Sequence, residues 1–149
     1  MVEKSKIEKL VTEFIDGKGV FLVAVKVSSS NRITVLVDTM QGIHIDECAA
    51  LHRYIEKSLD RDVEDFELEV SSPGLDMPFS VIEQYYKNEG NRIEVIDTND
   101  AKFNGILKFV TGGGFELETE VKVKGKAKEI SDISFNFDQV KSAKVILSI

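Results

Sequence analysis

Cysteine is nearly absent from this 149-residue chain, in which Cys48 stands alone. A single cysteine excludes an internal disulfide framework and indicates a reducing compartment such as the cytoplasm. No apolar run approaches the ~20 residues that a membrane helix needs. The first residues also lack the basic head and apolar core of an export signal. We therefore expect a cytoplasmic protein with no part in a membrane.

Histidine is scarce as well, and its placement argues against a metal site. His44 and His52 are eight residues apart, whereas a helical zinc pair is separated by four. His52 follows Cys48 by four residues, but no third group of a catalytic set is indicated. The run Gly112-Gly113-Gly114 lacks the Lys-Ser/Thr that follows in a phosphate-binding loop. We expect no catalytic residues, no metal and no cofactor.

Positive charge does not dominate either half of the chain. The net charge is −7, and the residues through Pro78 include 9 basic and 15 acidic side chains against 10 and 11 afterwards. Broad affinity for nucleic acid needs a basic face, which the first half does not offer. An acidic half suits a basic protein partner. The simpler alternative is that the negative charge only keeps the protein soluble.

Proline occurs twice, and both residues lie in the stretch from Glu67 to Phe79. Residues 67–70 alternate charged and apolar side chains, as does a strand with one buried face. The sequence Ser-Ser-Pro-Gly at 71–74 then signals a turn. Pro73 fixes its own φ angle, and Gly74 tolerates angles that a side chain forbids. This predicts a stiff joint between an N-terminal domain, residues 1–77, and a C-terminal domain, residues 78–149.

The first domain has the pattern helix–strand–strand–helix–strand. An apolar stripe predicts a helix over 7–15, with Ser5 and Glu8 as its capping box and Gly17 at its end. Alternating runs at 20–27 and 32–38 predict a hairpin, with Phe21, Val23, Val25 and Val27 on one face. A helix capped by Asp46 runs to about residue 60, and a strand follows at 66–70. We expect an αββαβ sandwich of the α+β class.

The second domain opens with a short helix, capped by Ser80 and Glu83 and ended by Gly90. Short strands are predicted near 92–97, 102–110, 115–121, 133–137 and 143–147. The phenylalanines alternate toward the interior, and the glycine in mid-strand, Gly105, indicates a bend. Of the adjacent Tyr85 and Tyr86, one is expected to face the solvent. Five short strands after a helix predict a small closed or partly closed β-barrel.

One basic segment remains, with four lysines in seven residues: Lys122, Lys124, Lys126 and Lys128. These side chains are candidates for contact with RNA phosphates. A solvated hairpin tip beside Glu118, Glu120 and Glu129 is an equally good interpretation. The carboxylates of Asp38, Glu67, Glu69 and Asp76 are candidates for acid–base work. A hydrated surface fits Glu67 and Glu69 better, and Asp76 can bind backbone N–H groups of its own turn.

Several segments together resemble the RimP family of bacterial ribosome maturation factors. They are Val35-Leu36-Val37-Asp38, Gly42-Ile43, Asp46-Glu47-Cys48, Leu59-Asp60, Leu68 to Asp76, and Phe135 to Lys144. Their order and spacing follow the family over essentially the whole chain, and the joint motif is the most specific. Met77 is a departure, because members commonly carry arginine there.

The resemblance implies an N-terminal α+β domain and a C-terminal Sm-like, SH3-like barrel with no catalysis. It implies a cytoplasmic protein that binds the immature 30S small ribosomal subunit and assists its late assembly. The implied partners are the small-subunit protein uS12 and, additionally, 16S rRNA. The candidate partner-binding or interdomain residues are Ser71, Ser72, Pro73, Gly74, Leu75, Asp76 and the four lysines.

Two other hypotheses remain open. The first is an autonomous RNA-binding module that uses its barrel as Sm-like proteins do, with affinity that falls steeply with salt. The second is an enzyme that uses Asp38, Glu69 and Asp76. It ranks last, because the sequence indicates neither a nucleophile nor a base.

Overall fold

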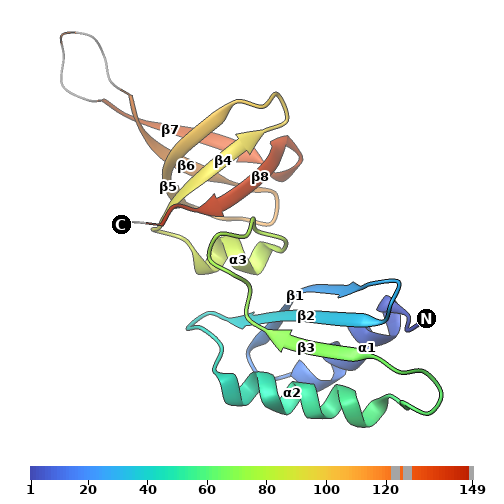
Figure 1. Cartoon of the computed structure of the whole chain (residues 1–149). Helices are drawn as coiled ribbons and strands as arrows, with labels where there is room; N and C mark the ends of the chain where they lie inside the picture. Colours follow the sequence, from blue (N-terminus) through green and yellow to red (C-terminus); the bar gives the residue numbers. More distant parts are fainter. Residues whose placement is uncertain (122–124, 126–128, 148–149) are drawn as a thin grey trace. The chain divides into compact units, whose positions relative to one another are not determined.

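A computed structural model of the chain describes residues 1–121, 125 and 129–147 (Figure 1). The chain divides into two compact units, Met1–Pro73 and Gly74–Ile149. This division falls inside the joint motif, four residues before the boundary expected from the sequence. That residues 1–77 and 78–149 act as separate domains remains a prediction.

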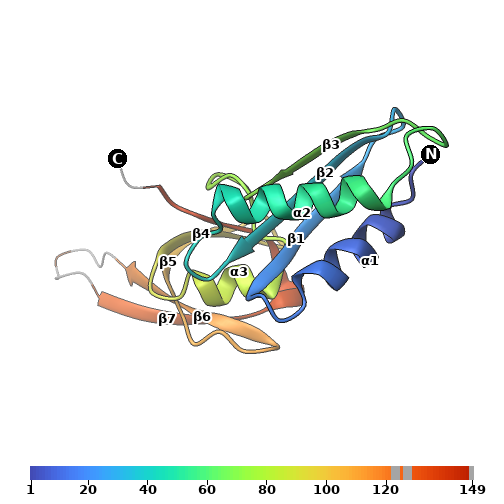
Figure 2. The ribbon, with the colours of Figure 1, turned by 90° about the horizontal axis from the view of Figure 1, so that it is seen from below.

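The first unit is a three-stranded sheet with two helices on one face (Figures 1 and 2). Its elements are α1 (Lys4–Ile15), β1 (Val20–Val27), β2 (Arg32–Thr39), α2 (Ile45–Ser58) and β3 (Glu67–Ser71). β1 and β2 form an antiparallel hairpin, and β3 pairs in parallel with β2, so the strand order is β1-β2-β3. The parallel pairing requires a crossover, which α2 supplies. The predicted αββαβ arrangement and α+β class are confirmed.

Between this sheet and its helices lies an aliphatic core. Its fully buried side chains come from the predicted stripe of α1 and from α2 and β2. They are Ile7, Val11, Ile33, Val35, Val37, Leu51 and Ile55. Each such side chain contributes about 1.5–3 kcal/mol by leaving water. This burial holds the unit together without a ligand.

The predicted inward face of β1 is wrong at its beginning. A register shift between Leu22 and Ala24 marks a β-bulge at Val23. A bulge adds one residue to a strand and reverses the alternation of faces across it. As a result Val20 and Leu22, rather than Phe21 and Val23, pack with the core below the helices.

Helix starts also differ from those expected. α2 begins after His44, whose backbone N–H donates to the Glu47 carboxylate at 3.1 Å. Asp46 is therefore inside the helix rather than its cap. α3 (Ile82–Lys87) begins after Val81, and Gln84 Oε1 accepts the N–H groups of Ser80 and Val81. A long side chain three residues into each helix reaches back to satisfy donors that the helix leaves free.

The second unit adds five strands to α3. They are β4 (Arg92–Asp97), β5 (Lys102–Lys108), β6 (Gly114–Val121), β7 (Glu129–Asn136) and β8 (Val140–Val145), with a short helix η1 (Phe137–Gln139) before β8. Every neighbouring pair is antiparallel in the order β7-β6-β5-β4-β8. The five predicted strands are confirmed.

Closure of these strands into a barrel is not observed in the described part of the chain. β7 and β8 are the two edges of the sheet. The helical turn η1 separates them and directs β8 to the far side of β4 (Figure 1). The sequence predicted a closed or partly closed barrel. Of these two, the closed form is wrong for the described residues, whose five antiparallel strands form a sheet in which the edge strands β7 and β8 do not pair with each other.

An aromatic cluster fills the interior of this unit. The ring of Tyr85 lies 4.9 Å from Phe79, 5.3 Å from Phe115 and 5.0 Å from Phe137. Such offset and edge-on pairs add about 0.5–1.5 kcal/mol each beyond the area they bury. Burial raises the pKa of the Tyr85 hydroxyl. Tyr85 is thus the inward member of the tyrosine pair, and Tyr86 is exposed.

Candidate partner-binding surfaces

The joint motif begins at the last residue of β3, Ser71, and continues into a turn. The N–H of Met77 donates to the carbonyl of Gly74 at 3.1 Å. The φ angle of Gly74 is not positive, but a Cβ there would lie 2.8 Å from Oδ1 of Asp76. Because both the Asp76 carboxylate and the Met77 side chain can move aside, neither the backbone angle nor the packing requires glycine at this position. Leu75 is 69% exposed, which makes it the accessible apolar side chain of the motif.

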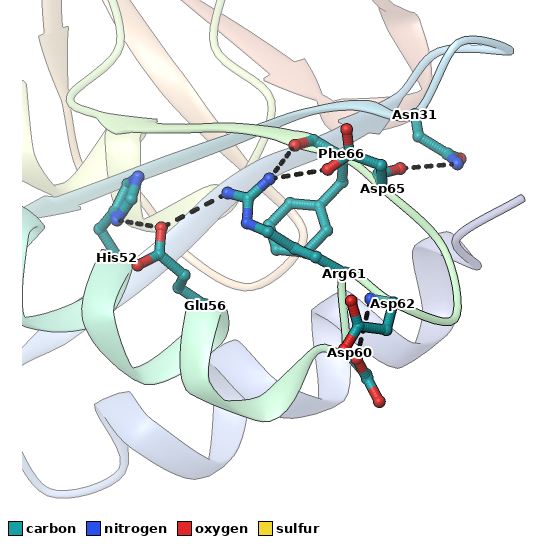
Figure 3. A network of polar contacts seen from close by, with 8 residues as sticks. All are labelled: Asn31, His52, Glu56, Asp60, Arg61, Asp62, Asp65 and Phe66. Carbon is teal, nitrogen blue, oxygen red and sulfur yellow. Dashed lines mark hydrogen bonds and ion pairs between the residues drawn. The ribbon is translucent and has the colours of Figure 1, made fainter.

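Arg61 anchors the loop that leads into β3 (Figure 3). Its Nη1 donates to the carbonyl of Phe66 at 2.7 Å and to Asp65 at 3.0 Å, and its Nη2 lies 3.5 Å from Glu56. The guanidinium also covers the Phe66 ring at 4.0 Å. A planar fork suits several acceptors at once. The network fixes the start of β3 relative to the end of α2.

Asn31 ties the same loop to the β1–β2 turn. Its φ of 59° is left-handed, a conformation that asparagine tolerates. Its Oδ1 accepts the N–H of Val2 at 2.9 Å, and its Nδ2 donates to the carbonyl of Asp65 at 3.1 Å. The terminal amine and Asn31 both bind Glu64 and hold the pKa of its carboxyl below the usual range. These polar side chains therefore stabilise the fold of the first unit.

The histidine and cysteine of α2 do not form a reactive pair. The Nε2 of His52 lies 3.2 Å from the carbonyl of Leu68, and its Nδ1 faces Glu56 (Figure 3). Cys48 packs against the apolar core. Burial, reinforced by the nearby Glu47 and Asp38 carboxylates, raises the pKa of its thiol. A raised pKa leaves less thiolate, which is the nucleophilic form.

The candidate acidic residues do not converge within the first unit. Asp38 is buried, and its Oδ1 accepts the N–H groups of Thr39 at 2.9 Å and Ile43 at 3.3 Å. Glu69 is exposed on β3 beside Thr34, so it lies about 13 Å along the sheet from Asp38. Among residues 1–121, 125 and 129–147, no three His, Cys, Asp or Glu side chains are grouped to hold a metal.

The four candidate lysines, Lys122, Lys124, Lys126 and Lys128, lie outside the described residues. They connect β6 and β7, which pair up to Val121 and Glu129. Residues 74–149 contain 10 basic and 12 acidic side chains, so without these four lysines 6 basic side chains face 12 acidic ones. The body of the second unit is therefore distinctly acidic.

The solvent-facing side of β6 shows where part of this acidity lies. Nζ of Lys108 is 3.2 Å from Asp132 and 3.8 Å from Glu118. The hydrogen bond to Asp132, with the charges of Asp132, Glu118 and Glu116, raises the pKa of Lys108. One cation is thus shared among three carboxylates.

Phe109 contradicts the expected inward alternation of the phenylalanines. It directly follows β5, is 64% exposed, and has a φ of 53°. Left-handed backbone costs about 1–2 kcal/mol for a residue with a side chain. In the described part of the chain, the other non-glycine residues with positive φ are Asn31 and Asp100, whose short polar side chains tolerate it. No pattern in the sequence indicates that this aromatic side chain is exposed.

A recess of about 340 Å³ lies beside α3 in the second unit. Its lining includes Phe79, Val81, Tyr85, Phe137 and Val140. Tyr85 has a raised pKa, but no carboxylate, histidine or cysteine of the described residues joins it in the lining, in contrast to a typical active site. No helix among the described residues is long and apolar enough to cross a bilayer.

Fold and surfaces together define a small α+β protein of two units. Its described polar side chains hold loops and strand ends in place, and its exposed apolar side chains include Leu75 and Phe109. Residues 10–76 match the family model of the RimP N-terminal domain.

Relatives extend the similarity to the second unit. A Porphyromonas gingivalis protein named ribosome maturation factor RimP is 36% identical over 152 residues, with 99% of this chain and all of the relative covered. Proteins of the same name from Christiangramia forsetii and Chlorobium luteolum are 37% and 32% identical, covering 85% and 93% of this chain and 78% and 93% of their own. The chain belongs to the RimP family of ribosome maturation factors.

Proposed function

We propose that this protein is a non-enzymatic ribosome maturation factor. It binds the immature 30S small subunit in the cytoplasm and assists its late assembly. The observation that carries the proposal is full-length similarity to a relative named for ribosome maturation. Because the alignment spans both units, the shared property concerns the whole architecture rather than one motif.

The proposed mechanism is selective binding. A protein that prefers one conformation of an assembling particle raises the population of that conformation in proportion to its differential affinity. No reaction step is needed for this effect. The partner proposed for the acidic surfaces is uS12, a basic small-subunit protein. Complementary charge speeds encounter and disfavours wrong partners.

The joint motif, Ser71 to Asp76, is proposed as part of the partner-binding surface. Leu75 is its exposed apolar side chain, and Pro73 limits the conformations of the segment. Pro73→Ala should weaken binding to immature subunits, because the segment would be more flexible when free and would lose more conformational entropy on binding. Unchanged binding would remove the motif from the site.

The central experiment is depletion of the protein in the organism that encodes it. Small-subunit precursors should accumulate, and the tagged protein should sediment with those precursors rather than with mature subunits. A pull-down with purified uS12, compared with a bait-free control, tests the direct partner. Normal subunit profiles after depletion would refute the proposed function.

A second candidate is an autonomous RNA-binding module of the Sm-like kind. The sequence feature that favours it is the lysine cluster at 122–128. It predicts that naked 16S rRNA binds directly and that a fourfold Lys→Glu exchange at 122, 124, 126 and 128 abolishes binding. The affinity should also fall steeply with salt as counterions are released. No binding of free RNA at moderate salt would eliminate this candidate.

A further inference from the structure

Phe109 lies in the loop that follows β5, and hydrogen bonds hold the backbone in place on both sides of it. Leu107 exchanges hydrogen bonds with the segment after α3: its N–H donates to Asn91 at 3.0 Å, and its carbonyl accepts from Gly90 at 2.7 Å. The N–H of Val110 donates to the Glu89 carboxylate at 3.4 Å. The exposed position of Phe109 is therefore imposed by an ordered frame.

Strand alternation would have placed Phe109 inside. Leu107 points into the core and Lys108 points out, so the next side chain along a regular strand would be buried. The left-handed turn at Phe109 breaks the alternation, and Val110 takes the interior place at 8% exposure. The largest apolar side chain of the segment is thus directed to solvent at a backbone angle that disfavours it.

Such an outlier points to function. Strained residues persist where the surrounding structure enforces them, and they concentrate at binding and catalytic sites. A glycine or asparagine would adopt this angle more readily than phenylalanine. Aromatic side chains, phenylalanine included, are also enriched in protein interfaces relative to the rest of the surface. Stability of the free protein does not explain the phenylalanine.

The charge around Phe109 distinguishes between classes of partner. Among the described residues, the cation that contacts the ring is Lys108, whose Nζ lies 5.6 Å from the ring centroid and is bound to Asp132 and Glu118. The Glu89 carboxylate accepts a hydrogen bond from the backbone N–H of Val110, the residue that follows Phe109. Stacking on nucleic-acid bases needs a positive groove for the phosphates. One cation and three carboxylates give this described surface a net negative charge, which suits a basic protein surface.

We propose that Phe109 is an aromatic anchor, which inserts into an apolar recess on a basic ribosomal protein of the immature small subunit. The inference rests on the proposed function and adds to it the contact residue and the class of surface contacted. Lys108, Glu118, Asp132 and Glu89 form the polar rim around the anchor.

The test compares Phe109→Asn with Ile130→Thr in the full-length protein. Asparagine removes the ring but tolerates the left-handed angle, so the variant should fold with a melting temperature close to that of the parent. Ile130, on β7, is the matched control because it is 68% exposed against 64% for Phe109. Binding to immature small subunits is measured by co-sedimentation across a protein titration.

Phe109→Asn should lower the affinity at least tenfold, while Ile130→Thr should remain within about twofold of the parent. These sizes match the loss of one hot-spot side chain and of one peripheral side chain. A photo-crosslinking phenylalanine analogue at position 109 should label a basic ribosomal protein.

Other results overturn the inference in distinguishable ways. If the parent binds and Phe109→Asn binds equally, the anchor is wrong and the proposed function stands. If the parent does not bind immature subunits, both fail. Crosslinks only to rRNA would refute a protein recess. A parent that self-associates through Phe109, seen as a sedimentation change in Phe109→Asn alone, would assign the residue to contact with a second copy.

Discussion

Gly105 offers a quantitative test of how β5 and β6 pack. The glycine lies in the middle of β5 and opposite Ile93 of β4. A Cβ at this position would lie 2.4 Å from the carbonyl oxygen of Glu118 and 2.9 Å from Cγ of Leu117. Carbon–oxygen contacts are normally ~3.3–3.6 Å. A methyl group would therefore force the two strands apart by about 1 Å.

The free-energy change can be estimated from two opposing effects. Gly→Ala in a strand gains about 0.5–1 kcal/mol through the smaller entropy of the unfolded chain. Overpacking a tight interior costs about 1–3 kcal/mol. The obstacle here is backbone, which cannot rotate away as a side chain would. We therefore expect Gly105→Ala to lower the free energy of unfolding of the second unit by about 2 kcal/mol.

The assay is urea unfolding followed by far-UV circular dichroism, with tyrosine fluorescence as a second probe because the chain has no tryptophan. Gly113→Ala is the matched control: nothing lies within 4 Å of its Cβ, and its φ is not positive. The control should leave the stability unchanged or raise it by up to about 1 kcal/mol, because it keeps the entropic gain and introduces no clash. If Gly105→Ala unfolds at the same midpoint as Gly113→Ala, the inferred strand contact is wrong.

Three further predictions concern the first unit. Arg61→Lys should lower its stability by about 1 kcal/mol, because a lysine cannot serve Phe66, Asp65 and Glu56 together; an unchanged urea midpoint would contradict this. The pKa of the Glu64 carboxyl is lower in the folded protein than in the unfolded chain, so Glu64 should stabilise the fold at pH values above the ordinary glutamate pKa. This stabilisation should be lost as the pH falls through the folded pKa. Glu64→Gln should therefore flatten the acid limb of a melting-temperature profile, and a parallel profile would refute the assignment. Cys48 should react with iodoacetamide at pH 8 more slowly in the folded protein than in urea, since partial burial and the nearby Glu47 and Asp38 carboxylates raise the pKa of its thiol. Equal rates would contradict this.

The local pattern of apolar and polar residues was sufficient to predict most of the helices and strands. The stripe of α1 lies on the core as expected, and the runs at 20–27 and 92–97 are strands with those bounds. Hydrophobic periodicity works here because each helix and strand has one face to bury. The candidate site was less accessible to such reasoning. The joint motif was found from its prolines, whereas Phe109 looked like an ordinary inward residue.

Contacts between residues distant in sequence account for the features that the sequence pattern predicted wrongly. The bulge at Val23 exists because β1 must pair with β2 in a register that the alternation of β1 alone does not contain. The helical turn η1 places β8 next to β4 and leaves the sheet open.

The amino-acid sequence by itself determined the class of this protein, the order of its helices and strands, and its family, since each depends on periodicity and local motifs. Tertiary structure alone decided which side chains remain outside. Phe109 is exposed because the pairing around Leu107 and Val110 turns the backbone there, and that pairing joins residues distant in sequence. Burial depends on neighbours in space, which local periodicity does not specify.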